Sequence, residues 1–158
     1  MKQAILIFIL LVFAKPLYSQ VIDLGQTISQ VQDSLKMYHI PYDTIDLGKD
    51  RKDRVVIKIK KKNIFGLSGD EYIEFGVPRV VGSIDWVYDS TATVETAYKF
   101  SWNVRKRLYK MITPESIKKE NYLFYDYWSM PDRKAWVSLS DKGELSFTFY
   151  VPDYGYNK

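Results

Sequence analysis

Carboxylates on predicted strands are the side chains of this chain best suited to acid–base chemistry. Glu74, Asp85 and Asp126 each fall within a stretch that we predict to be a β-strand. Two such groups on either side of a glycosidic bond can hydrolyse it. Their spacing does not by itself bring two of them into one pocket, so a carboxylate-based hydrolase of the cell envelope is the alternative interpretation. On that interpretation, replacement of Asp126 abolishes an activity and leaves stability intact.

Other catalytic and metal-binding arrangements match the sequence poorly. His39 is the only histidine and no nucleophile motif lies near it, so a Ser-His-Asp relay is not indicated. The chain has no cysteine, which excludes disulfides, thiolate zinc sites and cysteine nucleophiles. Residues 66–69 lack the lysine and hydroxyl that follow in a phosphate-binding loop. We therefore predict that the protein is not an enzyme and has no catalytic residue, metal or cofactor.

An aromatic run at residues 122–128 gives the main indication of binding. If its odd-numbered residues face the core, its even-numbered residues face the other way, together with two aromatic residues of the neighbouring strands. An exposed aromatic stripe beside small hydroxyl residues suits recognition of another envelope or extracellular protein, a peptide or a glycan. Under the alternative, a loop, the first helix or the carboxyl tail covers this face and forms a two-sided core. The predicted binding residues are Phe124, Asp126, Trp128, Trp136 and Tyr150.

Cations gather in two stretches of the chain. Residues 49–62 hold eight cations and two acids, and residues 105–119 hold six cations and one acid. The predicted basic surface consists of Lys58, Lys60 and Lys62 on the outer face of one strand. Contact with an anionic membrane surface or an acidic protein is one interpretation, and protection of a sheet edge against aggregation is the other. Expected export argues against nucleic acid as a partner.

These candidate residues need a sheet to position them, and the clearest part of that sheet is a hairpin in the last third. The stretch that follows Gly143 alternates between apolar and polar residues, and the stretch before it is apolar and aromatic. We predict a loop over residues 141–143, with Gly143 in the left-handed conformation. The predicted register places Leu139 opposite Leu145, Val137 opposite Phe147, Ala135 opposite Phe149 and, on the outer side, Trp136 opposite Thr148.

The rest of the chain predicts two helices and further strands. Thr27 and Gln30 form a capping box at the start of a short helix that covers about residues 27–37. A longer amphipathic helix covers about residues 91–112, with Ser90 and Thr91 as candidate caps and Val94 on its inner face. Two strands before it pair with Ile59 opposite Ile73, and a third covers about residues 80–88.

The predicted fold is therefore α+β. It is a two-layer domain with an antiparallel sheet of about six strands, the long helix on one face and the element order helix, three strands, helix, three strands.

The amino terminus predicts export. Lys2 precedes an apolar run at residues 4–14, which Lys15 and Pro16 interrupt before a small residue at Ser19. This pattern is typical of a cleaved signal peptide, and the apolar run is shorter than the about 20 residues that span a bilayer. We predict a signal peptide at residues 1–20 and a single domain at residues 21–158, located in the periplasm or secreted. A retained anchor is the alternative, and lipid attachment through a terminal cysteine is excluded.

One stretch resembles a known group of proteins. Gly25, Thr27, Val31 and Leu35, with Pro41 shortly after, are similar to the opening of small bacterial envelope domains of the SmpA/OmlA and beta-lactamase-inhibitor-like group. The resemblance covers residues 24–41 and the order of elements. It implies a short helix packed on an antiparallel sheet, and it suggests inhibition of an extracytoplasmic enzyme as a third possible function. The leading expectation is an exported, non-catalytic binding module that uses an aromatic open sheet face.

Overall fold

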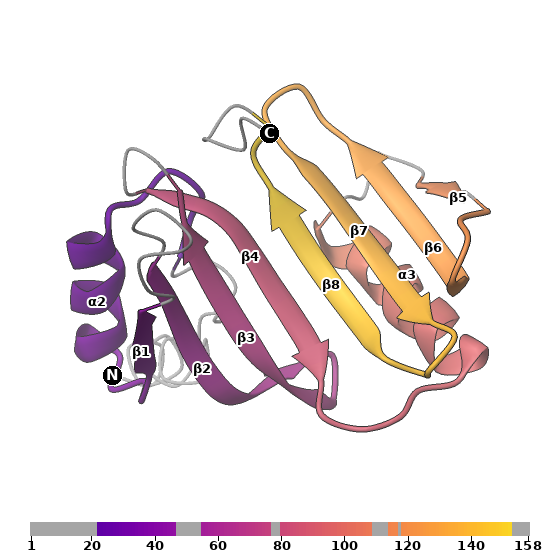
Figure 1. The fold of residues 1–158 in the computed structure, drawn as a ribbon, viewed down its shortest axis with the longest axis horizontal. Helices are drawn as coiled ribbons and strands as arrows, with labels where there is room; N and C mark the ends of the chain where they lie inside the picture. Colours follow the sequence, from indigo (N-terminus) through magenta and orange to yellow (C-terminus); the bar gives the residue numbers. More distant parts are fainter. Residues whose placement is uncertain (1–21, 47–54, 77–79, 109–113, 117, 153–158) are drawn as a thin grey trace, which may run out of the picture.

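The computed structural model describes residues 22–46, 55–76, 80–108, 114–116 and 118–152, which form one antiparallel sheet and two helices (Figure 1). The strands lie in the order β1-β2-β3-β4-β8-β7-β6-β5 across the sheet. The predicted signal peptide lies outside the described residues, and within them neither helix has the length and apolar character needed to cross a membrane. The elements are α2 (Ile28–Met37), β1 (Asp43–Asp46), β2 (Val55–Ile64), β3 (Leu67–Phe75), β4 (Val81–Tyr88), α3 (Val94–Leu108), β5 (Glu115–Ser116), β6 (Tyr122–Ser129), β7 (Lys134–Ser140) and β8 (Leu145–Tyr150).

The predicted α+β class and the order of the longer elements are confirmed, but the sheet has eight strands and not six. The two additional strands are short and lie at the two edges. β1 pairs with β2 and the two residues of β5 pair with β6, and neither short strand was predicted from the sequence. Strands this short contain too few residues to show an alternation of apolar and polar residues. Their position therefore depends mainly on backbone pairing with the neighbouring strand.

Helix α2 begins with the predicted capping box. The backbone N–H of Gln30 donates to Thr27 Oγ1 at 3.4 Å, and the backbone N–H of Thr27 donates to Gln30 Oε1 at 2.8 Å. Val31 and Leu35 lie one turn apart on the inner side of the helix and are fully buried. They belong to a cluster that includes Ile57 and residues of β3 and β4. This cluster is the core of the amino-terminal half of the sheet.

Helix α3 begins at Val94, later than its predicted start at about residue 91. Thr93 Oγ1 accepts a hydrogen bond from the backbone N–H of Thr96 at 3.2 Å, so Thr93 is the capping residue and Ser90 and Thr91 are not. Val94, predicted to face the sheet, is 48% exposed. Val94 is the first residue of α3 and precedes the turns that pack on the sheet through Ala97, Phe100 and Val104. The predicted end of this helix at about residue 112 lies outside the described residues.

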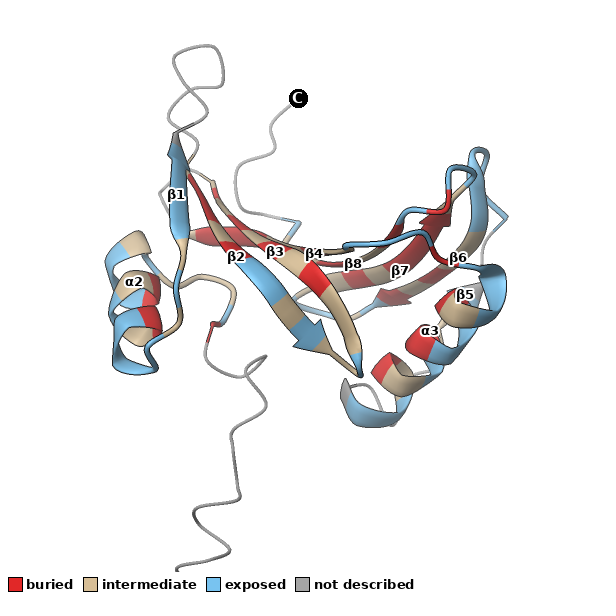
Figure 2. Cartoon of the chain, turned by 90° about the horizontal axis from the view of Figure 1, so that it is seen from below, coloured by how far each residue is buried: buried red, intermediate tan, exposed pale blue. Residues whose placement is uncertain are grey.

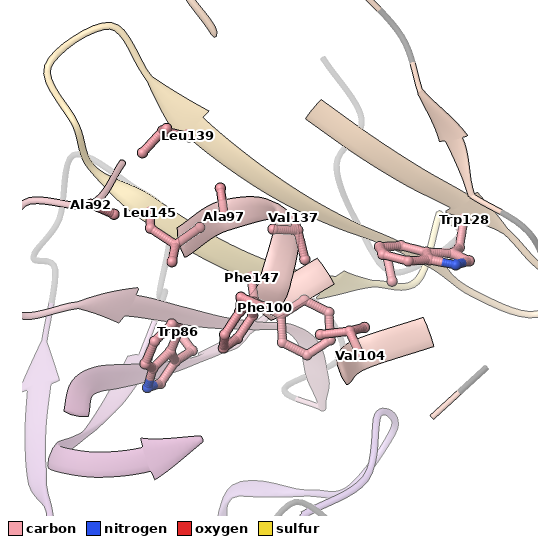
Figure 3. Close-up of a cluster of buried hydrophobic side chains, with 11 residues drawn as sticks. Trp86, Ala92, Ala97, Phe100, Val104, Trp128, Val137, Leu139, Leu145 and Phe147 are labelled. Atoms are coloured by element: carbon pink, nitrogen blue, oxygen red, sulfur yellow. The ribbon is translucent and has the colours of Figure 1, made fainter. Parts of the chain in front are cut away.

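The inner side of α3 builds the second core. Phe100 stacks on Trp86 of β4, with the ring centroids 5.0 Å apart and the rings nearly parallel (Figure 3). It also contacts Phe147 of β8 edge to face, with centroids 6.0 Å apart. Ala97 and Val104 lie on the same side of the helix and are fully buried. This core holds α3 against β4, β8, β7 and β6.

Both helices lie on the same face of the sheet (Figure 2). The apolar residues Ile57, Ile73, Ile84 and Phe149 are successive partners across four strands and therefore share that face. The opposite face, which we call the open face, is covered by no helix of the described residues. The open face carries Val56, Lys58, Asp70, Tyr72, Glu74, Ser83, Asp85, Val87, Tyr125, Tyr127, Lys134, Trp136, Ser138, Ser146, Thr148 and Tyr150.

The carboxyl-terminal hairpin has the predicted register. All four predicted pairs between β7 and β8 are present, including Trp136 opposite Thr148. The backbone N–H of Ser140 donates to the carbonyl of Glu144 at 3.0 Å and closes the loop over residues 141–143. Gly143 has the predicted positive φ of 81°. A Cβ at this position would also approach Thr91 Cγ2 to 2.5 Å, so both the conformation and the space favour glycine.

The β2–β3 hairpin differs from the predicted register by two residues. Ile57, and not Ile59, is opposite Ile73. The turn has only two residues, Phe65 and Gly66, both with positive φ, as a type I′ turn requires. A register shift between Ile59 and Lys62 adds the remaining offset. Phe65 is not a residue that signals such a turn, which explains the wrong register.

Candidate binding surface on the open face

A row of cross-strand partners crosses the open face from β2 to β6. Neighbouring members are paired in the ladders of five successive strand pairs, so their side chains lie side by side on the same face. The members are Lys58, Tyr72, Asp85, Thr148, Trp136 and Tyr127. We call this set the open-face row.

The centre of the open-face row is a carboxylate held by two hydroxyls. Thr148 Oγ1 donates to Asp85 Oδ1 at 2.6 Å, and Ser83 Oγ donates to Asp85 Oδ2 at 3.1 Å. Ser83 Oγ also lies 3.5 Å from Glu74 Oε2, which brings a second carboxylate to the same place. Burial raises the pKa of Asp85, the two hydroxyls oppose the rise, and the charge of Glu74 adds to it.

Aromatic rings form the side of the open face over β8, β7 and β6. The rings of Trp136 and Tyr150 have centroids 6.5 Å apart, and Tyr127 is the cross-strand partner of Trp136. Tyr125 lies two residues along β6, opposite Ser138. Its pKa is raised by burial, with additional contributions from Tyr122 and Tyr127. All four rings on this side are half-buried, so part of each ring is available to a ligand.

The predicted positions of Trp136 and Tyr150 on the open face are confirmed, but three other predicted binding residues lie on the helix face. Trp128 is fully buried (Figure 3). Asp126 is 7% exposed. The hydroxyl of Ser101 on α3 donates to Asp126 Oδ2. Phe124 is opposite Leu139 and packs against the same core. The prediction for these three residues placed them on the wrong face of β6.

The reason for this error lies at the beginning of β6. The prediction assigned Leu123 and every second residue after it to the core. Leu123 is 58% exposed, and the β6–β7 register shifts between Tyr122 and Phe124. This irregularity reverses the alternation. The small side chain of Ala135, opposite Trp128, leaves room for the indole on the helix face.

The predicted basic surface is divided by ion pairs. Lys58 Nζ lies 2.6 Å from Asp70 Oδ2, and Lys60 Nζ lies 2.7 Å from Asp43 Oδ2. Lys62 pairs with Glu71, which faces the helix side, because the register shift at Lys62 redirects the strand. The three lysines therefore do not form a common cationic face as predicted.

The acid that neutralises Lys58 is part of the open face. The hydrogen bond and charge of Asp70 raise the pKa of Lys58, whose Nζ also lies 4.9 Å from the centroid of the Tyr72 ring. The same pair lowers the pKa of Asp70. The Lys58 end of the open-face row is therefore held by an ion pair and an aromatic ring.

Sequence reasoning missed the centre of the open-face row. Asp85 and Thr148 are 63 residues apart and meet only because β4 pairs with β8. Strand alternation places each on an outward position, but it does not predict which strands become neighbours. Among the described residues, no group of three or more acidic or histidine side chains could hold a metal ion. Comparison of the chain with models of protein families, with curated proteins and with solved structures gives no match.

Proposed function

We propose that the protein is an exported, non-catalytic binding module of the bacterial cell envelope, and that its open face binds a glycan. The open-face row carries this proposal, because it places aromatic rings directly beside carboxylates and hydroxyls. The C–H face of a sugar packs on rings such as Trp136 and Tyr127. The sugar hydroxyls can donate charge-assisted hydrogen bonds to carboxylates such as Asp85 and Glu74.

The backbone groups of the strands in the open-face row are already hydrogen-bonded to neighbouring strands, which favours a glycan over a peptide as the ligand. A peptide that binds by strand addition needs an unpaired sheet edge. At the positions of the open-face row, β2, β3, β4, β8, β7 and β6 are each paired with a strand on both sides. The side chains alone therefore form the contact surface. Asp85 and Thr148 are already held in place by their hydrogen bond, which lowers the entropic cost of binding.

The two carboxylates also favour a particular kind of glycan. Glu74 and Asp85 approach one another through Ser83, so a ligand with its own carboxylates would meet like charges. A neutral or amino-sugar glycan avoids this repulsion. We expect binding of neutral polysaccharides and little binding of uronic-acid polysaccharides.

Export is supported by the amino-terminal sequence alone. Lys2, the apolar run of residues 4–14 and the small residue Ser19 form the pattern of a signal peptide. Expression of the full chain with export intact, followed by amino-terminal sequencing of the product, tests this part of the proposal. A product that retains Met1 would contradict cleavage.

Affinity electrophoresis tests glycan binding. The full chain is run through native gels that contain neutral or uronic-acid polysaccharides, beside the variants Trp136→Ala and Trp102→Ala. We expect a neutral polysaccharide to retard the unmodified protein and Trp102→Ala, but not Trp136→Ala. Trp102 is the matched control because it is an exposed tryptophan on α3. Equal retardation of both variants would contradict the proposed surface.

A carboxylate hydrolase is the second candidate, favoured by one observation. Asp85 has a raised pKa and lies near a second acid, which is an arrangement found in glycosidases. Against it, both oxygens of Asp85 accept hydrogen bonds from neighbouring hydroxyls. Asp126, the residue expected to be essential in such an enzyme, is buried beneath α3. Release of reducing ends from a bound polysaccharide, lost in Asp85→Asn, would establish this second function.

A further inference from the structure

The outer side of α3 carries exposed apolar side chains at a regular spacing. Val94, Tyr98 and Trp102 follow one another at intervals of four residues and are 48%, 60% and 52% exposed. Residues four apart lie on the same side of a helix, so these three form a continuous stripe. The outer side of a helix that packs on a sheet is normally polar, and such a stripe marks a contact surface.

Cations flank this stripe. Four cations and one acid lie within α3, and the single acid, Glu95, is paired with Lys99 at 2.6 Å. The guanidinium carbon of Arg105 lies 5.5 Å from the centroid of the Trp102 ring. Lys106 follows Trp102 by one turn and is exposed. The stripe is therefore bordered by positive charge.

We propose that α3 lies flat on the surface of an anionic lipid bilayer, with the stripe of Val94, Tyr98 and Trp102 in the headgroup region. Tryptophan and tyrosine side chains are enriched at this depth, because each combines an apolar ring with a polar atom. Neighbouring lysine and arginine side chains are attracted to the lipid phosphates. An acidic protein would also complement this charge, and its binding is distinguished from a bilayer contact by the response of Trp102 emission to polyglutamate and to vesicles.

The fold supports this orientation. The inner side of α3 is fixed to the sheet through Phe100 and Val104, so the helix is already formed before it meets a membrane. α3 lies on the face of the sheet opposite to the open face (Figure 2). A chain bound through α3 therefore directs the open face away from the bilayer. The membrane contact does not depend on the proposed glycan binding, because the two surfaces share no residue.

Quenching of tryptophan fluorescence by brominated lipid tests the proposal. Vesicles of phosphatidylglycerol and phosphatidylcholine with brominated acyl chains are mixed with the full chain. Trp86 and Trp128 are buried, so Trp102 and Trp136 are the informative tryptophans. We expect quenching that is lost in Trp102→Phe and retained in Trp136→Phe. The apolar run of residues 4–14 is common to all variants, so any contribution from it does not affect this comparison.

A charge reversal provides the second measurement. Lys106→Glu changes the charge at the membrane by two units, and we expect the partition coefficient to fall roughly thirtyfold at low salt. The matched control, Lys134→Glu, reverses a charge on β7, in the row of Ser83 and Tyr150 on the open face, and should leave partitioning unchanged. Quenching that is equal in neutral phosphatidylcholine vesicles, or unaffected by Trp102→Phe, would overturn the proposal. A shift of Trp102 emission by polyglutamate but not by vesicles would assign the surface to an acidic protein and also overturn it.

Discussion

The two faces of the sheet carry similar residues in different surroundings. On the helix face, Asp126 accepts a hydrogen bond from the hydroxyl of Ser101 and lies near the buried indole of Trp128. On the open face, Asp85 accepts a hydrogen bond from the hydroxyl of Thr148, which is the cross-strand partner of Trp136. Each face therefore combines an aspartate, a hydroxyl and a tryptophan.

The difference between these two groups is what covers them. α3 covers the first group and makes it part of the core. No described helix covers the second group, and its tryptophan remains half-buried. Composition and alternation cannot distinguish a structural aromatic residue from a binding residue. Whether an aromatic residue belongs to the core or remains available for binding depends on the element that packs over it. The two faces can therefore be distinguished by the effect of the same substitution on stability.

The largest expected effect is the loss of a tryptophan from the helix face. Trp128→Ala removes a fully buried side chain and should lower the free energy of unfolding by about 3–5 kcal/mol. Trp136→Ala removes a half-buried side chain on the open face and should cost about 1 kcal/mol. Urea unfolding followed by circular dichroism measures both. Similar losses for the two variants would show that the open face is also part of a core.

A smaller but still large effect is expected for the ion pairs of β2. The side chains of Lys62 and Glu71 are 11% and 6% exposed on the helix side, and Glu71 Oε2 has no hydrogen-bond partner among the described residues. Lys62→Met leaves Glu71 buried without its cation and should cost about 3 kcal/mol.

Lys60→Met is the matched control for this prediction. Lys60 and Asp43 form an exposed pair, and pairs of this kind contribute little to stability. We expect no measurable change in the urea midpoint of this variant. A loss as large as that of Lys62→Met would mean that burial does not separate the two pairs.

The sequence predicts those parts of the fold that depend on local signals. The capping box of Thr27 and Gln30 predicted the start of α2, and Gly143 predicted the register of β7 and β8. In both cases the residues that determine the structure are close in the chain. The two wrong predictions of strand position have a common cause, which is an irregularity in a strand. A shift at Leu123 reversed β6, and a shift at Lys62 added to the offset that the two-residue turn at Phe65 had already given β2 against β3.

The candidate site was harder to predict than the fold. Trp136 and Tyr150 were assigned to the open face because a well-defined hairpin contains them. Asp85, at the centre of the open-face row, was recognised only as a carboxylate on a strand. Its partner Thr148 comes from a strand 63 residues away, and no local signal pairs β4 with β8. Contacts of this kind follow from the order of strands in the whole sheet.

The smallest expected effects are the pH dependences of two aspartates on the open face, which should have opposite signs. Burial raises the pKa of Asp85 above its ordinary value of 3.8, so the folded state binds more protons than the unfolded state between the two values. Its contribution to stability is therefore most favourable below the ordinary pKa, and it falls as the pH rises toward the folded-state pKa. Lys58 lowers the pKa of Asp70, whose contribution is present above the ordinary value and is lost as the pH falls.

Urea unfolding of Asp85→Asn and Asp70→Asn at neutral and acidic pH measures these signs. Relative to the unmodified protein, Asp85→Asn should gain stability as the pH rises from acidic to neutral, because the variant no longer carries a buried charge. Asp70→Asn should lose relative stability over the same interval, by a small amount, since its ion pair is partly exposed and is screened by salt. The comparison between pH values cancels the constant cost of each substitution. If relative stability changes in the same direction for Asp85→Asn as for Asp70→Asn, Asp85 is stabilised as a carboxylate, and its hydrogen bonds from Thr148 and Ser83 outweigh the effect of burial.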